Sequence, residues 1–207
     1  IVTGRTPAHH GIVNNILLQP ERSSPDWYWQ RNYIRGTTLY DEVLKQGKHV
    51  AALLWPVTAK SEITWNLPEI FANRRWTNQI LTSAANGTVG YQLMLNHRFG
   101  RLRDGIRQPA LDNFVHASLK YTLKTYRPDL TLVHFTDLDT QRHHYGVHSE
   151  EAAAAIKRHD ERIGELMHLL HQNRMSVKRD TTVIILGDHS QLDVRNVILI
   201  NKLLREQ

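Results

Sequence analysis

One apolar run that ends in acidic and histidine side chains constrains this chain more than any other feature. Residues 130–135 are apolar or β-branched apart from His134, and Arg127-Pro128 stands just before them. This composition predicts a strand that is buried on both faces, as in a parallel sheet. A predicted loop, closed by Tyr145-Gly146, follows the strand and holds Asp137, Asp139, His143, His144 and His148. Ligands bind at the carboxyl ends of the strands in open α/β sheets, so these side chains are candidates for a functional site.

A second stretch repeats this design. Residues 181–186 form another apolar run, and Gly187-Asp188-His189-Ser190 follows it. Two neighbouring parallel strands that end this way would direct four side chains into one crevice: Asp139, His143, Asp188 and His189. Carboxylates and imidazoles are ligands that zinc prefers. Either aspartate alone could instead cap the helix that follows it, but the two clusters together favour a metal site.

The motifs also resemble a known family. Asp139-x-x-x-His143-x-Tyr145-Gly146 and Gly187-Asp188-His189-Ser190 are similar to motifs of the alkaline phosphatase superfamily, and within it to the type I phosphodiesterase/nucleotide pyrophosphatase family. Residues 1–15 resemble the segment that follows the nucleophile of that family. Trp55-Pro56-Val57 and Leu67-Pro68-Glu69-Ile70 resemble stretches of its bacterial members. The resemblance runs in order along nearly the whole chain.

The resemblance implies a function and a site. The family hydrolyses phosphodiester or pyrophosphate bonds with two divalent ions, normally Zn²⁺, that clamp the phosphate of a small anionic phosphoester such as a nucleotide. By position, Asp139 and His143 would hold one ion, and Asp188 with His189 the other. Asn15 would donate a hydrogen bond from its side-chain amide to a phosphoryl oxygen. Without the resemblance, Asn15 is better interpreted as a turn residue. The neighbouring His9-His10 pair looks like a metal motif, but the resemblance gives it a structural role.

Part of the family pattern lies outside these 207 residues. The resemblance places the threonine nucleophile and one metal-binding aspartate before residue 1, and a further metal-binding histidine beyond residue 207. Each ion would then keep two protein ligands, whereas catalytic zinc normally has three. We therefore expect the chain by itself to be inactive and to bind metal weakly.

The sequence predicts an α/β fold with a mostly parallel sheet and helices on both faces. The resemblance implies that this fold is alkaline-phosphatase-like and incomplete at both ends. The expected strands cover about 49–55, 130–136 and 181–186, all adjacent or nearly so. Thr38 is a predicted N-cap, followed by a helix whose apolar face holds Leu39, Val43 and Leu44. Ser149 is a second predicted N-cap, and the buried stripe of its helix should hold Ala152, Ile156, Asp160, Ile163, Met167 and Leu170.

Length and composition narrow the class of protein. A single α/β domain over 1–207 is expected, with residues 58–107 as an insertion that shapes the substrate pocket in the family. No apolar run approaches the ~20 residues of a membrane helix, so we expect no membrane partner. The chain has no cysteine, which leaves only His, Asp and Glu as metal ligands and favours a reducing, cytoplasmic location. The sequence does not decide whether a signal peptide precedes Ile1, and it does not indicate an oligomeric state.

Three alternatives stay open at this point. Another branch of the superfamily, such as a phosphonoacetate hydrolase, a phosphomutase or a sulfatase, shares the Asp-His pairs. A basic nucleic-acid-binding module would fit the net charge of +6 and the four arginines of residues 98–107, although a solvated loop is the better interpretation of that segment. A metal-free scaffold is the third. Residues 27–29, Trp-Tyr-Trp, either stack on a base or pin a surface loop.

Overall fold

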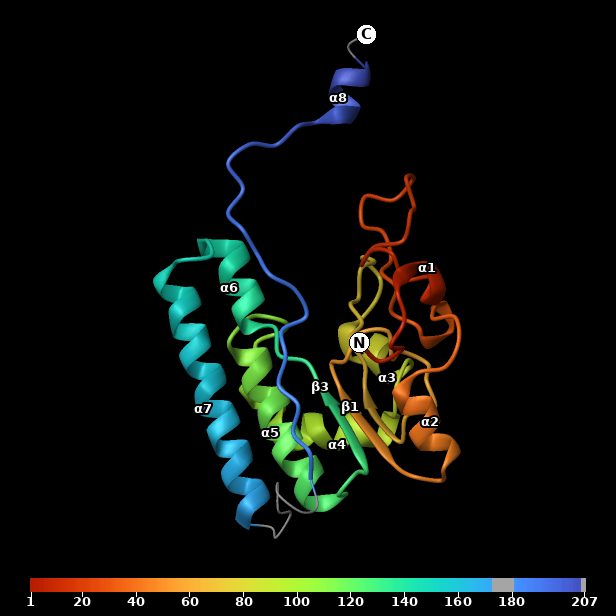
Figure 1. Cartoon of the computed structure of the whole chain (residues 1–207), viewed down its shortest axis with the longest axis vertical. Coiled ribbons are helices and arrows are strands. Elements are labelled where there is room, and N and C mark those ends of the chain that lie inside the picture. Colours follow the sequence, from red (N-terminus) through yellow and green to blue (C-terminus); the bar gives the residue numbers. More distant parts are fainter. Residues whose placement is uncertain (173–180, 206–207) are drawn as a thin grey trace. The chain divides into compact units, whose positions relative to one another are not determined.

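The computed structural model describes residues 1–172 and 181–205 (Figure 1). It divides into two compact units, residues 1–136 and residues 137–207, and each is described by itself. The first unit holds the parallel sheet, and the second holds the candidate metal ligands. The prediction of a single domain is not decided by this division.

A three-stranded parallel sheet forms the centre of the first unit. Its strands are β1 (Val50–Leu53), β2 (Trp65–Leu67) and β3 (Leu130–Val133), in the order β2-β1-β3. β1 and β3 pair in register from Val50↔Leu130 to Leu53↔Val133. The strands expected near 49–55 and 130–136 are therefore confirmed as parallel neighbours. β2 was not predicted, because its three residues are too few to show a periodic pattern.

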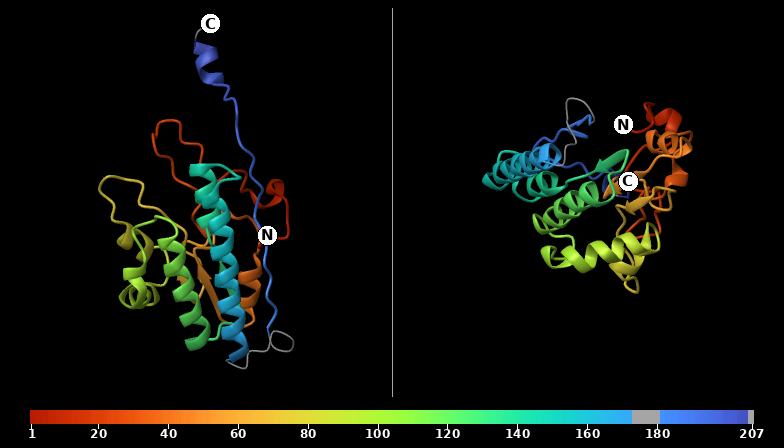
Figure 2. Two further views of the ribbon diagram at one scale, coloured as in Figure 1. Left: turned by 90° about the vertical axis from the view of Figure 1, so that its left-hand side faces the viewer. Right: turned by 90° about the horizontal axis from the view of Figure 1, so that it is seen from below.

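Helices cover both faces of this sheet, as predicted. α2 (Leu39–Lys45) packs on one face, where Tyr40 joins Val50, Ala52 and Leu132 in a buried cluster. α4 (Val89–Phe99) and α5 (Ala110–Thr125) lie on the other side of the strands (Figure 2). Four apolar side chains of α5 are buried: Phe114, Val115, Leu119 and Leu123. The α/β class with helices on both faces is thus confirmed.

The predicted start of α2 is confirmed in detail. Thr38 accepts a hydrogen bond from the backbone of Asp41, and Asp41 accepts one from the backbone of Thr38, which is a capping box. Arg31 adds a two-point contact, because its Nε lies 3.3 Å from Oδ1 of Asp41 and its Nη2 lies 2.5 Å from Oδ2. The predicted apolar face was partly wrong: Leu39 is 51% exposed, and its neighbour Tyr40 is fully buried. The helix turns that way because Tyr40 fills the cluster over β1.

The first unit has several short elements besides these. They are α1 (Pro7–His10), α3 (Gln79–Ala84) and the 3-10 turns η1 (Arg31–Tyr33) and η2 (Gly100–Leu102). Residues 58–107 therefore contribute an edge strand and helices to this unit. Their role in shaping a substrate pocket stays a prediction.

The second unit is built on a helical hairpin. α6 (Asp137–Tyr145) and α7 (Glu150–Gln172) are joined at Gly146, whose φ of 98° closes the end of α6. Residues 137–145 were predicted as a loop, and this prediction was wrong. The segment has few apolar residues, so it shows no helical stripe, and its helix is stabilised by polar contacts to α7. Ser149 caps α7 as predicted, with its Oγ accepting the backbone N–H of Ala152 at 3.1 Å.

The expected strand at 181–186 is not formed. These residues have no strand pairing in the structure, and Ile184, Ile185 and Leu186 are 76%, 64% and 49% exposed. An apolar, β-branched run favours an extended backbone, but a strand also needs a neighbour to supply its ladder of hydrogen bonds. The residues after this run stay extended as far as α8 (Ile200–Arg205).

The buried stripe predicted for α7 was also partly wrong. Ile156 is 51% exposed and Asp160 is exposed, whereas Arg162 is 5% exposed. The side of α7 that faces inward is set by an ion-pair cluster with α6, described below. Among the described residues, no helix is long and apolar enough to cross a membrane.

We predict that Asp41→Asn destabilises the protein at neutral pH by about 1–2 kcal/mol, since it weakens a charge-assisted contact. Burial alone would raise the pKa of Asp41, but hydrogen bonds from Arg31 and Thr38 outweigh it and lower the pKa. The ionised side chain therefore stabilises the fold above the usual pKa of an aspartate, and this contribution is lost as the pH falls through the lowered value.

Urea unfolding at pH 7 and in acid would measure this, and the gap between wild type and variant should close in acid. Glu42→Gln is the matched control, since Glu42 and Lys45 form an ion pair whose side chains are about half exposed. A gap that is the same at every pH would contradict the assignment.

Candidate functional site

The first predicted ligand pair is created by helix geometry. Asp139 and His143 are four residues apart on α6, so their side chains lie on the same face. The Nε2 of His143 lies 3.5 Å from Oδ1 of Asp139. Both side chains are accessible, at 69% and 43% exposure. The sequence motif therefore corresponds to a pair of adjacent donors.

The second predicted pair lies on the extended segment after residue 186. The Nε2 of His189 is 3.4 Å from Oδ2 of Asp188 and 3.8 Å from Oδ1 of Asp139. Gln191 donates from Nε2 to the same Oδ1 of Asp139 at 2.9 Å. Asp193 accepts the backbone N–H of Val147 at 2.9 Å. All four predicted ligands are thus neighbours in the second unit, although the predicted strand before Asp188 is absent.

Within each predicted ligand pair, the two donor atoms are spaced as in a divalent-metal site. In a tetrahedral zinc site with bonds of about 2.0–2.2 Å, the donor atoms lie about 3.3–3.6 Å apart. The pairs Asp139–His143 and Asp188–His189, at 3.5 and 3.4 Å, match that spacing. Within the described residues, however, no three or more His, Asp or Glu side chains form a group that could hold a metal ion. The ligand types and the spacing within each pair therefore fit zinc, but the described residues do not form a complete coordination shell.

A buried ion-pair cluster stands beside this site and was not found from the sequence. Asp137 is fully buried at the first turn of α6. It contacts Arg158 through Nε at 2.7 Å and through a terminal nitrogen at 3.0 Å, and Arg162 at 3.4 Å. Burial would raise the pKa of Asp137, but hydrogen bonds from Arg158 and Gln141, with the charges of both arginines, lower it. Asp137 is therefore a charged structural residue.

The N-terminal candidates lie in the first unit. Asn15 is exposed, its carbonyl accepts the backbone N–H of Tyr28 at 3.0 Å, and its side-chain amide has no hydrogen-bond partner among the described residues. His9 and His10 use ring nitrogens locally: Nδ1 of His9 lies 2.9 Å from Oγ1 of Thr6, and Nδ1 of His10 accepts the N–H of Ile12. These contacts favour the structural interpretation of the histidine pair and leave the Asn15 amide available.

The sequence profile described as Type I phosphodiesterase / nucleotide pyrophosphatase matches residues 1–207. The chain belongs to this family. It is 24% identical over 217 residues to ectonucleotide pyrophosphatase/phosphodiesterase family member 1 of Homo sapiens, covering 99% of this chain and 19% of that protein. Family member 3 of Bos taurus is 26% identical over 200 residues, covering 91% and 18%. Venom phosphodiesterase of Macrovipera lebetinus is 24% identical over 200 residues, covering 91% and 19%. The chain spans about a fifth of the length of these relatives.

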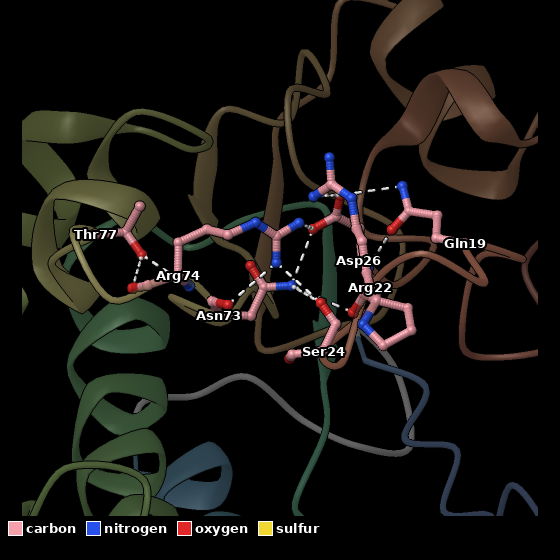
Figure 3. A network of polar contacts seen from close by, with 8 residues as sticks. Gln19, Arg22, Ser24, Asp26, Asn73, Arg74 and Thr77 are labelled. Atoms are coloured by element: carbon pink, nitrogen blue, oxygen red, sulfur yellow. Dashed lines mark hydrogen bonds and ion pairs between the residues drawn. The ribbon is translucent and has the colours of Figure 1, made fainter.

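A polar network fixes one loop of this phosphodiesterase-family chain. Asp26 is its hub: Oδ1 accepts from Arg74 at 2.6 Å and from Asn73 at 2.9 Å, and Oδ2 accepts from Gln19 at 3.3 Å (Figure 3). Arg74 and Asn73 also reach backbone carbonyls of residues 24 and 25. The network joins residues 19–26 to residues 73–77, which are far apart in sequence. Both segments belong to the poorly patterned part of the chain, so sequence reasoning did not reveal it.

The aromatic residues that follow Asp26 pin the same loop. Trp27 and Trp29 each meet the ring of Phe71 edge to face, with centroids 5.6 Å and 6.4 Å apart. Tyr28 meets Tyr33 in the same way at 5.3 Å. Such contacts stabilise by about 0.5–1.5 kcal/mol beyond burial. The structure thus supports loop pinning for residues 27–29, rather than base stacking.

Three of the four arginines of residues 98–107 contact side chains of this chain, although only Arg103 is partly buried. Arg98 lies over the ring of Tyr121 at 4.7 Å, and Arg103 lies over Phe114 at 5.2 Å. Arg107 pairs with Asp104 at 3.0 Å. These contacts account for three of the four arginines on which the nucleic-acid alternative depended, and they weaken that alternative.

The loop after β1 carries a second feature that the sequence did not reveal. Leu54, Val57 and Lys60 have φ values of 51°, 57° and 57°. This region of backbone space is unfavourable for a β-branched residue such as Val57. Strain of this kind often gathers at functional sites, and this loop leaves the carboxyl end of the central strand.

We predict that Asp26→Ala loosens the loop at residues 19–30 and destabilises the protein by about 1–3 kcal/mol, because two donors lose a partly buried acceptor. Tryptophan fluorescence and limited proteolysis would report on it, since Trp27 and Trp29 lie in the loop. Arg22→Gln is the control, because Arg22 contacts Asp26 only at 3.4 Å and is 46% exposed. Equal effects of the two variants would show that Asp26 is not the hub.

Proposed function

We propose that this chain is the part of a metal-dependent phosphodiesterase or nucleotide pyrophosphatase that supplies half of each of two zinc sites. The observation that carries the proposal is the gathering of Asp139, His143, Asp188 and His189 within one unit, with neighbouring donor atoms 3.4–3.8 Å apart. Family membership over the whole chain agrees with it. The substrate class is a small anionic phosphoester, including nucleotides.

The two pairs would have separate tasks. Asp139 and His143 would hold one divalent ion, and Asp188 with His189 the other. When bound, such ions withdraw charge from the phosphate and lower the pKa of bound water. Gln191 already contacts Oδ1 of Asp139 and would keep that carboxylate in a fixed orientation.

Asn15 is proposed as a donor to the phosphoryl oxygen. Its accessible amide could give a hydrogen bond where negative charge develops in the transition state. A preorganised donor of this kind commonly accounts for about 10²–10³ in turnover. The proposed reaction also needs the nucleophile and the remaining ligands that the family resemblance places outside residues 1–207.

The phosphonoacetate hydrolase, phosphomutase and sulfatase alternatives would use the same pairs with a different nucleophile. The type I phosphodiesterase profile covers the whole chain and favours the phosphodiesterase or pyrophosphatase reaction over them. A measurement of metal binding distinguishes the proposed function from the metal-free scaffold alternative, which would bind no metal.

We expect Zn²⁺ to bind residues 1–207 weakly, and an Asp139→Ala/Asp188→Ala double variant to bind it at least ~10-fold more weakly, since each pair loses its anionic donor. Competition with a zinc-binding dye would measure this. The matched control is Asp160→Ala/His171→Ala, which removes an exposed aspartate and an exposed histidine of α7. Undiminished affinity in the first variant would refute the assignment.

A protein that joins this chain to the segments with the nucleophile and the remaining metal ligands should hydrolyse a nitrophenyl phosphodiester with zinc. There we expect Asn15→Ala to lower turnover by roughly 10²-fold, as loss of one oxyanion donor does, and His189→Ala to abolish it. Asn32→Ala is the control, because Asn32 is also exposed and its side-chain amide has no hydrogen-bond partner among the described residues. Near-normal turnover of the Asn15 variant would exclude the proposed donor role.

A further inference from the structure

The two polar pairs of α6 point in opposite directions. Successive residues of an α-helix are turned by about 100°, so Asp137 and Gln141 lie about 40° apart on one side. On the same scale Asp139 and His143 lie about 200° and 240° from Asp137, on the opposite side. Exposure agrees with this division, because Asp137 and Gln141 are 0% and 9% exposed, whereas the side chains of Asp139 and His143 are 43% and 69% exposed.

The buried side of α6 is held by charge. Arg158 and Arg162, one turn apart on α7, both contact the carboxylate of Asp137, and Arg158 does so through two nitrogens. Gln141 donates to Oδ1 of Asp137 at 3.0 Å. The backbone N–H of Leu138 donates to Nε2 of His159, also on α7, at 3.4 Å. Asp137, Arg158 and Arg162 are called the α6 clamp below.

Apolar packing would fix the rotation of α6 far less well. The helix is strongly polar, and its buried residues are Asp137 and Gln141. A two-point arginine–carboxylate contact is directional, because both parallel hydrogen bonds break when one partner rotates. The clamp therefore selects a single rotation of α6 about its axis.

We propose that the α6 clamp is a positioning device that presents Asp139 and His143 together as ligands for one metal ion. This inference rests on the proposed function. The clamp does not touch the metal; it acts through α6, as outer contacts act on the ligands of other metal sites. Its geometry also explains why Asp139 meets Gln191 and His189 on the side of α6 away from α7.

The test uses Co²⁺ as the probe, because its visible absorption reports on the geometry of its ligands as well as on occupancy. In residues 1–207 we expect Asp137→Asn to weaken Co²⁺ binding by about 10- to 100-fold, the usual effect of losing an outer contact, and to change the absorption bands. Circular dichroism would confirm that the variant is folded at the titration temperature.

Three further variants make the result specific. Asp41→Asn breaks an arginine–aspartate contact at the first turn of α2, in the other unit, and should leave Co²⁺ binding unchanged. Arg158→Lys keeps the charge but loses the two-point contact, so it should weaken binding to a smaller extent than Asp137→Asn. It also serves if Asp137→Asn fails to fold. Asp139→Ala removes a proposed ligand and should abolish the Co²⁺ bands of the Asp139–His143 site.

Failure of the inference and failure of the proposed function give different results. If Asp139→Ala lowers Co²⁺ binding while folded Asp137→Asn binds with wild-type affinity and spectrum, the clamp is only structural and the metal site stands. If wild type and Asp139→Ala bind alike, the proposed metal site is wrong. Metal-free amide hydrogen exchange of residues 138–145 then decides whether the clamp holds α6: faster exchange in Asp137→Asn supports it, and unchanged exchange overturns it.

Discussion

The complete burial of β1 is the constraint on which the first unit depends. All four of its residues, Val50 to Leu53, have no exposed surface. A strand of this kind needs neighbours on both edges and a layer on each face, because its backbone groups and side chains have no access to water. β2 and β3 occupy the edges, α2 covers one face, and α5 contacts the strand from the other side. Parallel pairing brings the carboxyl ends of these strands to the same edge of the sheet.

The second unit is organised by polar contacts instead. α6 has few apolar residues, and the carboxylate of Asp137 is its most buried group. Burying a charge is unfavourable unless it is paired, so the two arginines of α7 are a requirement of this arrangement. The same contacts leave the Asp139 side of α6 accessible. One face of this short helix thus has a structural role, and the other face has the proposed metal ligands.

The candidate metal ligands come from two kinds of backbone. Asp139 and His143 are adjacent through helix geometry alone, because four residues make about one turn. Asp188 and His189 are adjacent in sequence, and Gln191 and Asp193 connect their segment to Asp139 and Val147. The second pair reaches the first without a strand. A donor set from two segments agrees with membership in the type I phosphodiesterase/nucleotide pyrophosphatase family.

Local signals in the sequence were sufficient wherever a few neighbouring residues determine the conformation. The capping residues Thr38 and Ser149, and the strand at residues 130–133, were predicted because each depends on propensity and short-range hydrogen bonding. The pattern Asp139-x-x-x-His143 likewise determined a donor pair. The apolar run at residues 181–186 did not determine a strand, because a ladder also needs a partner.

Tertiary structure decided which faces are buried. Tyr40 is buried and Leu39 exposed because the cluster over β1 accepts the tyrosine ring. On α7, Arg162 is buried and Asp160 exposed, because Asp137 supplies the opposite charge on one side only. Hydrophobic periodicity contains no information on such a partner, which lies 25 residues away in sequence. The sequence by itself therefore determined two strands of the sheet, β1 and β3, and the starts of α2 and α7. Apolar packing decided how α2 is turned, and the pairing of distant charges decided how α6 and α7 are turned.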